Sequence, residues 1–115
     1  MTEEEYSIKK RKKLFVDDGT LLPEEEIEEI TPCERWNWAG AQQGEMCFAD
    51  DKLIFWTFYD NPIVIKYSDI AEINLFNIRL IFPAGIAITV NVSDLKPLTY
   101  KFAFHKRNKY GARKI

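Results

Sequence analysis

The strongest constraint on the fold is an alternation of apolar and polar residues that recurs from residue 44 onward. In "GIAITVNV" (residues 85–92) every second side chain is apolar, and the residues between them include Thr89 and Asn91. The stretches "EMCFA" (45–49) and "LTYKFAF" (98–104) repeat the pattern. A period of two places alternate side chains on opposite faces of a strand. The sequence therefore predicts a mainly β fold of antiparallel strands, each with one face in the core.

The connections between these strands carry turn signals. "KLIFWTFY" (52–59) is apolar on both faces, so we expect it to be the best-buried strand. Asp50-Asp51 separates it from "EMCFA" and predicts a two-residue hairpin turn. "YSDI" (67–70) predicts a corner between strands, because Ser and Asp bond readily to neighbouring backbone groups. Short strands and tight turns favour a meander that closes into a small barrel or sandwich.

Serine catalysis at this corner is not expected. Ser68 lacks a GxSxG elbow, and the chain holds a single histidine, His105, as a candidate base. Asp17-Asp18 and Asp50-Asp51 sit at turn signals, where Asp is favoured for backbone reasons. We find no phosphate loop and no acid–base pair that spacing would bring together. The sequence predicts a protein that is not an enzyme.

Length and composition bound the domain organisation. A chain of 115 residues with 46% hydrophobic content suits one domain with its own core. We interpret residues 1–22 as a charged, flexible arm with a turn at Asp18-Gly19, and residues 23–115 as the folded domain. The glutamates of "EEEIEE" suit a helix that Thr31-Pro32 interrupts, after which Trp36 and Trp38 alternate as in a strand. A helical period is expected in the last dozen residues, "FHKRNKYGARKI".

The remaining composition predicts a cytoplasmic protein without a cofactor. No apolar run approaches the roughly 18 residues of a membrane span, and "MTEEEYSIKKRKK" lacks a signal-peptide core. Cys33 and Cys47 form no CxxC motif, so we expect two thiols packed in strands and no metal. The aromatic residues around 36–38 and 55–59 suit either a stacking platform for a ligand or the core, and their alternation with aliphatic residues favours the core.

Charge is unevenly distributed along the chain. Residues 1–13 carry five basic and three acidic groups, residues 14–94 carry four and fifteen, and residues 95–115 carry seven and none. Basic termini on an acidic body affect which partners the protein can bind rather than how it folds. The candidate residues for binding an anion or a partner are Lys9, Lys10, Arg11, Lys12, Lys13, Lys106, Arg107 and Lys109. These residues either meet phosphates or an anionic surface, or form a solvated face, or pair with the acidic segment Glu24–Glu29 of this chain or a neighbouring one.

Five segments in order resemble the bacterial GRAM-like branch of the pleckstrin-homology (PH-like) superfold. They are "LLPEEEI", "GEMCFADDKLIFWTF", "IVIKYSDIAEI", "IFPAGIAITV" and "YKFAFHKRNKY", and together they cover about residues 20–115. The resemblance implies a barrel of about seven antiparallel strands in two nearly orthogonal sheets, with a short C-terminal helix at one open end. Members that bind phosphoinositides carry several Lys and Arg residues on the first two strands. Here "ERWNWAGAQQGEMCFA" offers Arg35, so the usual headgroup site is not expected.

The functional expectation is a non-catalytic binding or scaffolding module. It would recruit a protein partner or lie peripherally on an anionic membrane. The alternative is association with nucleic acid through the basic termini, against which the acidic body argues. A short C-terminal helix would leave apolar strand ends uncovered near Phe102 and Tyr110. We therefore expect residues 1–22 to pack over the barrel of their own chain or of a second copy, the latter giving a homodimer.

Overall fold

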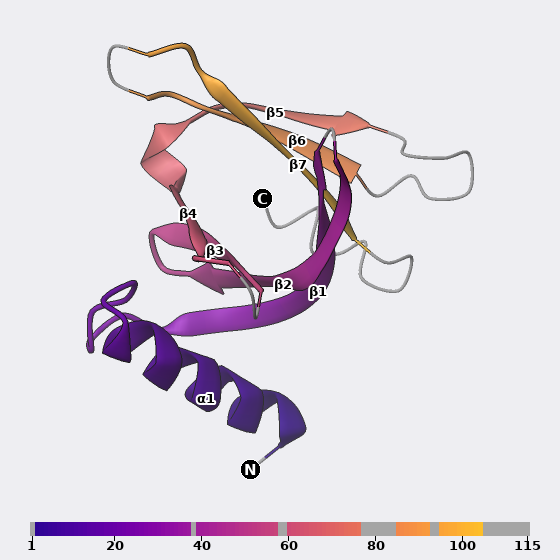
Figure 1. Cartoon of the computed structure of the whole chain (residues 1–115). Helices are drawn as coiled ribbons and strands as arrows, with labels where there is room; N and C mark the ends of the chain where they lie inside the picture. Colours follow the sequence, from indigo (N-terminus) through magenta and orange to yellow (C-terminus); the bar gives the residue numbers. More distant parts are fainter. Residues whose placement is uncertain (1, 38, 58–59, 77–84, 93–94, 105–115) are drawn as a thin grey trace.

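The computed structural model describes residues 2–37, 39–57, 60–76, 85–92 and 95–104. In these ranges the chain forms one α-helix, seven strands and a single turn of 3₁₀ helix (Figure 1). The elements are α1 (Glu3–Asp17), β1 (Ile27–Asn37), β2 (Gly40–Ala49), β3 (Lys52–Trp56), β4 (Ile63–Lys66), η1 (Tyr67–Asp69), β5 (Ile70–Phe76), β6 (Gly85–Val90) and β7 (Leu98–Phe104). The prediction of a mainly β fold with about seven antiparallel strands is confirmed.

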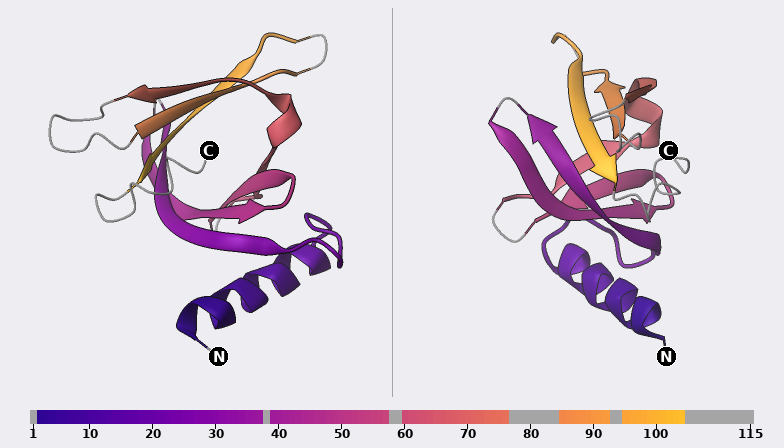
Figure 2. Two further views of the ribbon diagram at one scale, coloured as in Figure 1. Left: turned by 180° about the vertical axis from the view of Figure 1, so that it is seen from behind. Right: turned by 90° about the vertical axis from the view of Figure 1, so that its right-hand side faces the viewer.

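All seven strands belong to one antiparallel sheet in the order β4-β3-β2-β1-β7-β6-β5. Figures 1 and 2 show this sheet curling so that its two ends approach each other. The expected closed barrel of two nearly orthogonal sheets is therefore wrong, because β4 and β5 form the two edges and do not pair. The chain turns through η1 between them. Two backbone hydrogen bonds connect this corner to its neighbours: Tyr67 N–H donates to Asp51 O at 3.0 Å, and Asn91 N–H donates to Asp69 O at 2.9 Å.

The curled sheet has an apolar cluster on each of its faces. The inner cluster gathers side chains from β1 to β4 and from β6 and β7: Cys33, Met46, Phe48, Leu53, Phe55, Ile65, Ile86, Ile88, Val90, Phe102 and Phe104. The alternation in β2, β6 and β7 predicted which of their residues face inward. The outer cluster consists of Phe15, Leu21, Ile27, Cys47, Ala49 and Ile54. It lies between the sheet and α1, which crosses the outside of β1 and β2 in both views of Figure 2.

Helix α1 corrects the interpretation of residues 1–22 as a flexible arm without helical period. Phe15 is fully buried, and Ile8 and Val16 pack beside it on the outer cluster. The helix lies on the sheet of its own chain. Arg11 and Lys12 share the sheet-facing side with these apolar residues, which hides the helical period when hydrophobicity alone is considered.

The glutamates before Thr31-Pro32 do not form the helix that we expected this pair to interrupt, because strand β1 begins at Ile27 and continues through Thr31-Pro32. Pro32 lies opposite Glu45 of β2, whereas pairing with β7 begins at Cys33. Within the described residues, Pro32 therefore has no partner on its β7 side, and a residue without an N–H costs no ladder hydrogen bond at such a position.

Other local predictions are confirmed. The Asp50-Asp51 turn joins β2 to β3, and every residue of β3 from Lys52 to Phe55 is buried. The corner at Tyr67–Asp69 is the 3₁₀ turn η1, and the Tyr67 hydroxyl donates to Ala49 O at 3.2 Å. The predicted C-terminal helix lies outside the described residues. Among the described residues, no helix has both the length and the apolar character needed to cross a bilayer.

Candidate functional site

The first candidate surface is α1, which carries the basic run of residues 9–13. Thr2 caps the helix by accepting the Glu5 N–H on its hydroxyl at 3.1 Å. The first turn consists of Glu3, Glu4 and Glu5, whose charges are favourable beside the positive end of the helix dipole. The helix ends at the predicted turn, where Gly19 takes a φ of 84° that glycine adopts without strain.

Arg11 fixes this helix to the sheet. Its Nε lies 2.8 Å from Glu45 Oε1 of β2, and its guanidinium carbon lies 4.3 Å from the centre of the Trp56 ring of β3. The Arg11 and Glu45 side chains are about a fifth and a third exposed. Because the ion pair and the cation–π contact share one guanidinium, they fix the orientation of α1 about its own axis on the sheet. Arg11 is thus engaged within the chain.

Lys12 forms an ion pair with the acidic segment Glu24–Glu29 of its own chain. Its Nζ lies 2.6 Å from Glu26 Oε1, just before β1. Of the pairings considered from sequence, this one forms within the chain. Glu26 is two-thirds exposed, so screening by solvent limits what the pair adds to stability.

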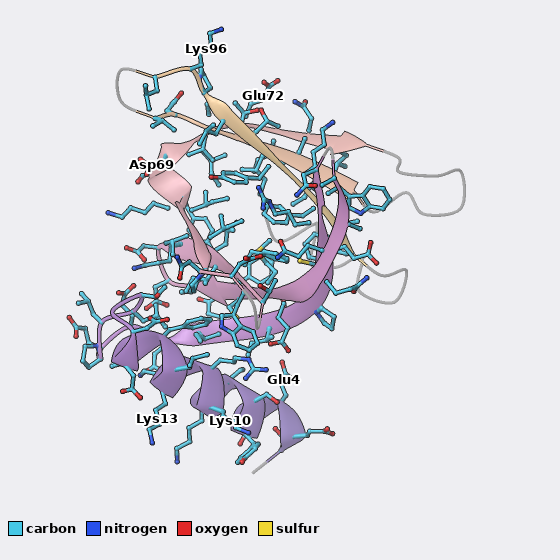
Figure 3. All side chains as sticks on the ribbon, viewed as in Figure 1. Glu4, Lys10, Lys13, Asp69, Glu72 and Lys96 are labelled. Carbon is cyan, nitrogen blue, oxygen red and sulfur yellow. The ribbon has the colours of Figure 1, made fainter. Side chains whose placement is uncertain are left out.

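The other three cations of the run face away from the sheet. Lys9, Lys10 and Lys13 are exposed, and Figure 3 shows Lys10 and Lys13 pointing into solvent from the outer side of α1. Tyr6 lies on the same side, 56% exposed, with Lys10 Nζ 5.7 Å from its ring centre. The structure thus divides the predicted basic run into two inward and three outward residues. Lys106, Arg107 and Lys109 lie outside the described residues.

A second candidate surface is an open cavity of about 480 Å³ that the sequence did not indicate. It forms where the connection from α1 to β1 meets the β2–β3 turn and the end of β4, and its lining comprises Gly19, Thr20, Leu22, Glu25, Asp50, Asp51, Lys52 and Lys66. No local signal predicts it, because the bonds from Lys52 that join its two sides reach Thr20 and Glu25, 32 and 27 positions away in the sequence.

A largely buried ion pair forms one wall of this cavity. Lys52 Nζ lies 3.2 Å from Glu25, and Glu25 Oε1 also accepts the Leu22 N–H at 2.9 Å. The Leu22 N–H, together with Lys52, holds the pKa of Glu25 below its ordinary value against the opposing effect of burial. Lys66 lies directly opposite Lys52 on β4. Because Glu25 already neutralises the charge of Lys52, we interpret this ion pair as structural rather than as a catalytic group.

The thiols and the serine corner present no reactive arrangement among the described residues. Cys33 belongs to the inner cluster and Cys47 to the outer one, so the sheet separates them. Burial raises the pKa of both thiols, that of Cys47 to about 12. Ser68 is exposed in η1, and His105 lies outside the described residues. Within the described ranges, no group of three or more His, Cys, Asp or Glu side chains is placed to hold a metal ion.

Comparisons with known proteins bear on the fold. No family model matches the chain, and a search of curated proteins finds no match. The crystal structure of the C-terminal domain of an unknown protein from Leishmania infantum is similar, with a TM-score of 0.70 and 16% sequence identity. The alignment covers 90% of this chain and 94% of that domain. At this identity, the similarity shows a shared fold and carries no functional assignment.

Proposed function

We propose that the protein is a non-catalytic binding module of the PH/GRAM-like type that recruits a protein partner through the outer face of α1. The same face would give weak peripheral contact with an anionic membrane. The observation that carries this proposal is the division of the basic run: Arg11 and Lys12 hold the helix, while Lys9, Lys10 and Lys13 face solvent.

The fold is compatible with a PH/GRAM-like module. Seven antiparallel strands, the hairpin at Asp50-Asp51 and the corner at Tyr67–Asp69 follow the segments on which the resemblance rests. The open sheet and the helix on its outer face distinguish this chain from the closed barrel that the resemblance implies. That outer helix would supply a contact surface different from the headgroup site of members that bind phosphoinositides.

Magnitudes favour a protein over a membrane as the main partner. A lysine near an anionic lipid surface contributes about 1 kcal/mol, so three give about 3 kcal/mol, which corresponds to binding weaker than millimolar. The apolar side of α1 faces the sheet and is not available for insertion between lipids. On an acidic protein surface, in contrast, the lysines and the amphipathic Tyr6 ring would combine charge with buried area.

The test compares two double variants of equal charge change. K9Q/K13Q removes cations from the outer face of α1, whereas K96Q/K101Q removes two exposed lysines elsewhere. Proteins retained from native lysate at about 50 mM salt are identified for the wild type and both variants. We expect a retained acidic protein to be lost with K9Q/K13Q and kept with K96Q/K101Q.

Sedimentation with phosphatidylserine vesicles at low and high salt measures the membrane contact separately. We expect weak binding at low salt that disappears at high salt and with K9Q/K13Q. In the lysate experiment, equal retention of every protein by both variants would contradict a role for α1.

Filter binding to mixed DNA and RNA at about 50 mM salt, where the electrostatic contribution is strong, tests the nucleic-acid alternative. Absence of binding there would eliminate that alternative.

A further inference from the structure

The two edges of the sheet differ in how they are protected against pairing with another chain. β4 has four residues, follows Pro62 and ends at Lys66. β5 has seven residues, "IAEINLF", with neither proline nor lysine. Short length, proline, lysine and β-bulges are among the means by which proteins keep edge strands from pairing, and β5 has only a bulge near its start, between Ile70 and Glu72. In the described part of the chain β5 pairs with β6 on one side and leaves its other side open.

The open strand also carries uncovered apolar side chains. Ile73 lies opposite Ile88 and Leu75 opposite Ile86, so Ile73 and Leu75 share the inner face with two fully buried residues. Yet Ile73 is 36% exposed and Leu75 is 73% exposed. The outer face of β5 carries Glu72 and Asn74, and Figure 3 shows Glu72 pointing outward from the sheet. A strand that continued the sheet beyond β5 would shield the apolar pair and leave the polar pair wet.

We propose that β5 pairs with β5 of a second copy of this chain, antiparallel and across a two-fold axis at Asn74. A register shift between Ile70 and Glu72 confines the regular part of the strand to residues 72–76. The midpoint of these five residues is Asn74, so this register pairs the whole regular segment with itself. It places Ile73 of each copy opposite Leu75 of the other, and Asn74 opposite Asn74.

Charge is compatible with this register. The two Glu72 residues would lie about four residues apart along the paired strands, which is roughly 14 Å at about 3.4 Å per residue. That separation exceeds the Debye length of about 8 Å at physiological salt, so their repulsion is screened. A register centred on Glu72 would instead place the two carboxylates face to face, which destabilises a strand pair. The proposal concerns a different element from α1 and holds whether or not the proposed function is correct.

The first test measures self-association and uses a matched pair of variants. Leu75 and Leu95 are 73% and 71% exposed, so replacing either by lysine should leave the fold intact. Five paired residues form a small interface, so we expect a weak dimer, observable by sedimentation velocity between about 10 and 500 µM. L75K should weaken dimerisation at least tenfold because it places lysine on the pairing edge, whereas L95K should change it less than twofold.

A wild-type protein that stays monomeric throughout this range would overturn the proposal. Equal weakening by L75K and L95K would overturn it as well, because that result indicates general apolar adhesion rather than pairing at β5. Circular dichroism of each variant confirms that the fold is retained.

The second test fixes the register by disulfide formation. Asn74 of the two copies would face each other with Cβ atoms about 4.5–5.5 Å apart, close to disulfide geometry. We expect N74C to give a covalent dimer under mild oxidation, and E72C, exposed on the same outer face, to give little. The native thiols Cys33 and Cys47 are fully buried and do not compete. If E72C forms the covalent dimer as fast as N74C, pairing centred on Asn74 is refuted. It is also refuted if neither variant forms a covalent dimer.

Discussion

Replacing Phe15 with alanine should reveal how much α1 contributes to the stability of the sheet. The ring is fully buried in the outer cluster among Leu21, Ile27 and Ile54. Truncating a buried phenylalanine to alanine typically costs about 3–5 kcal/mol, out of a total of about 5–15 kcal/mol for a domain of this kind. F15A should therefore remove at least about a fifth of the free energy of unfolding, and about 40% at the middle of both ranges.

Urea denaturation followed by tryptophan fluorescence is a suitable assay, because Trp56 packs against the same outer cluster as Phe15. With a slope of about 1–3 kcal/mol/M, the midpoint should fall by roughly 2 M. Leu14 is the matched control: it is the preceding residue of the same helix, yet it is 38% exposed, so L14A should cost less than about 1 kcal/mol. If α1 detaches from the F15A sheet, the slope should also fall, since less surface remains to be exposed on unfolding. Equal and small effects of F15A and L14A would refute the docking of α1.

Three further predictions concern single positions. G44A should destabilise the protein by about 1–3 kcal/mol in the same urea assay, because an added Cβ would lie 2.5 Å from Trp56 O and 2.8 Å from the Phe55 ring, whereas Q43A on the same strand should be near neutral. E25Q should lose stability relative to the wild type above about pH 5, and the difference should shrink as pH falls below the ordinary value of 4.5, because the carboxylate stabilises the fold only while ionised; a difference independent of pH would contradict this. Both thiols should resist a thiol reagent at pH 8 in the folded protein and react in urea, since burial raises the pKa of Cys47 to about 12; rapid reaction without denaturant would contradict their burial.

The strands from β2 onward could be predicted because each carries its own signal. Alternation in residues 45–49 and 98–104 indicated which side chains face inward, and Asp50-Asp51 indicated the turn between β2 and β3. These features depend on neighbouring residues and on the face of a strand, so a single sequence contains them. The pairing order does not have this property. Whether β4 meets β5 depends on the corner at Tyr67–Asp69, whose backbone path the residues alone do not specify.

The location of uncovered apolar surface was also beyond the sequence. We expected it near Phe102, which is in fact fully buried, its ring centre 5.3 Å from that of Phe55. Phe102 lies on β7 between β1 and β6, whereas Leu75 lies on an edge strand. Both belong to strands with apolar residues on the inner face, so their sequence patterns do not distinguish them. Exposure is decided by the position of the strand in the sheet. Tyr110, the other residue of that prediction, lies outside the described residues.

The helix on the outer face explains why "KLIFW" is apolar on both sides. Leu53 and Phe55 enter the inner cluster, and Ile54 enters the outer one beneath α1. In contrast, Thr89 and Glu72 on the outer face of β6 and β5 are polar, because the described chain places no helix over them. A strand with two apolar faces needs a covering layer on each face. Phe15 and Leu21, from residues 1–22, supply that second layer over β3, although the period of the segment did not indicate a helix.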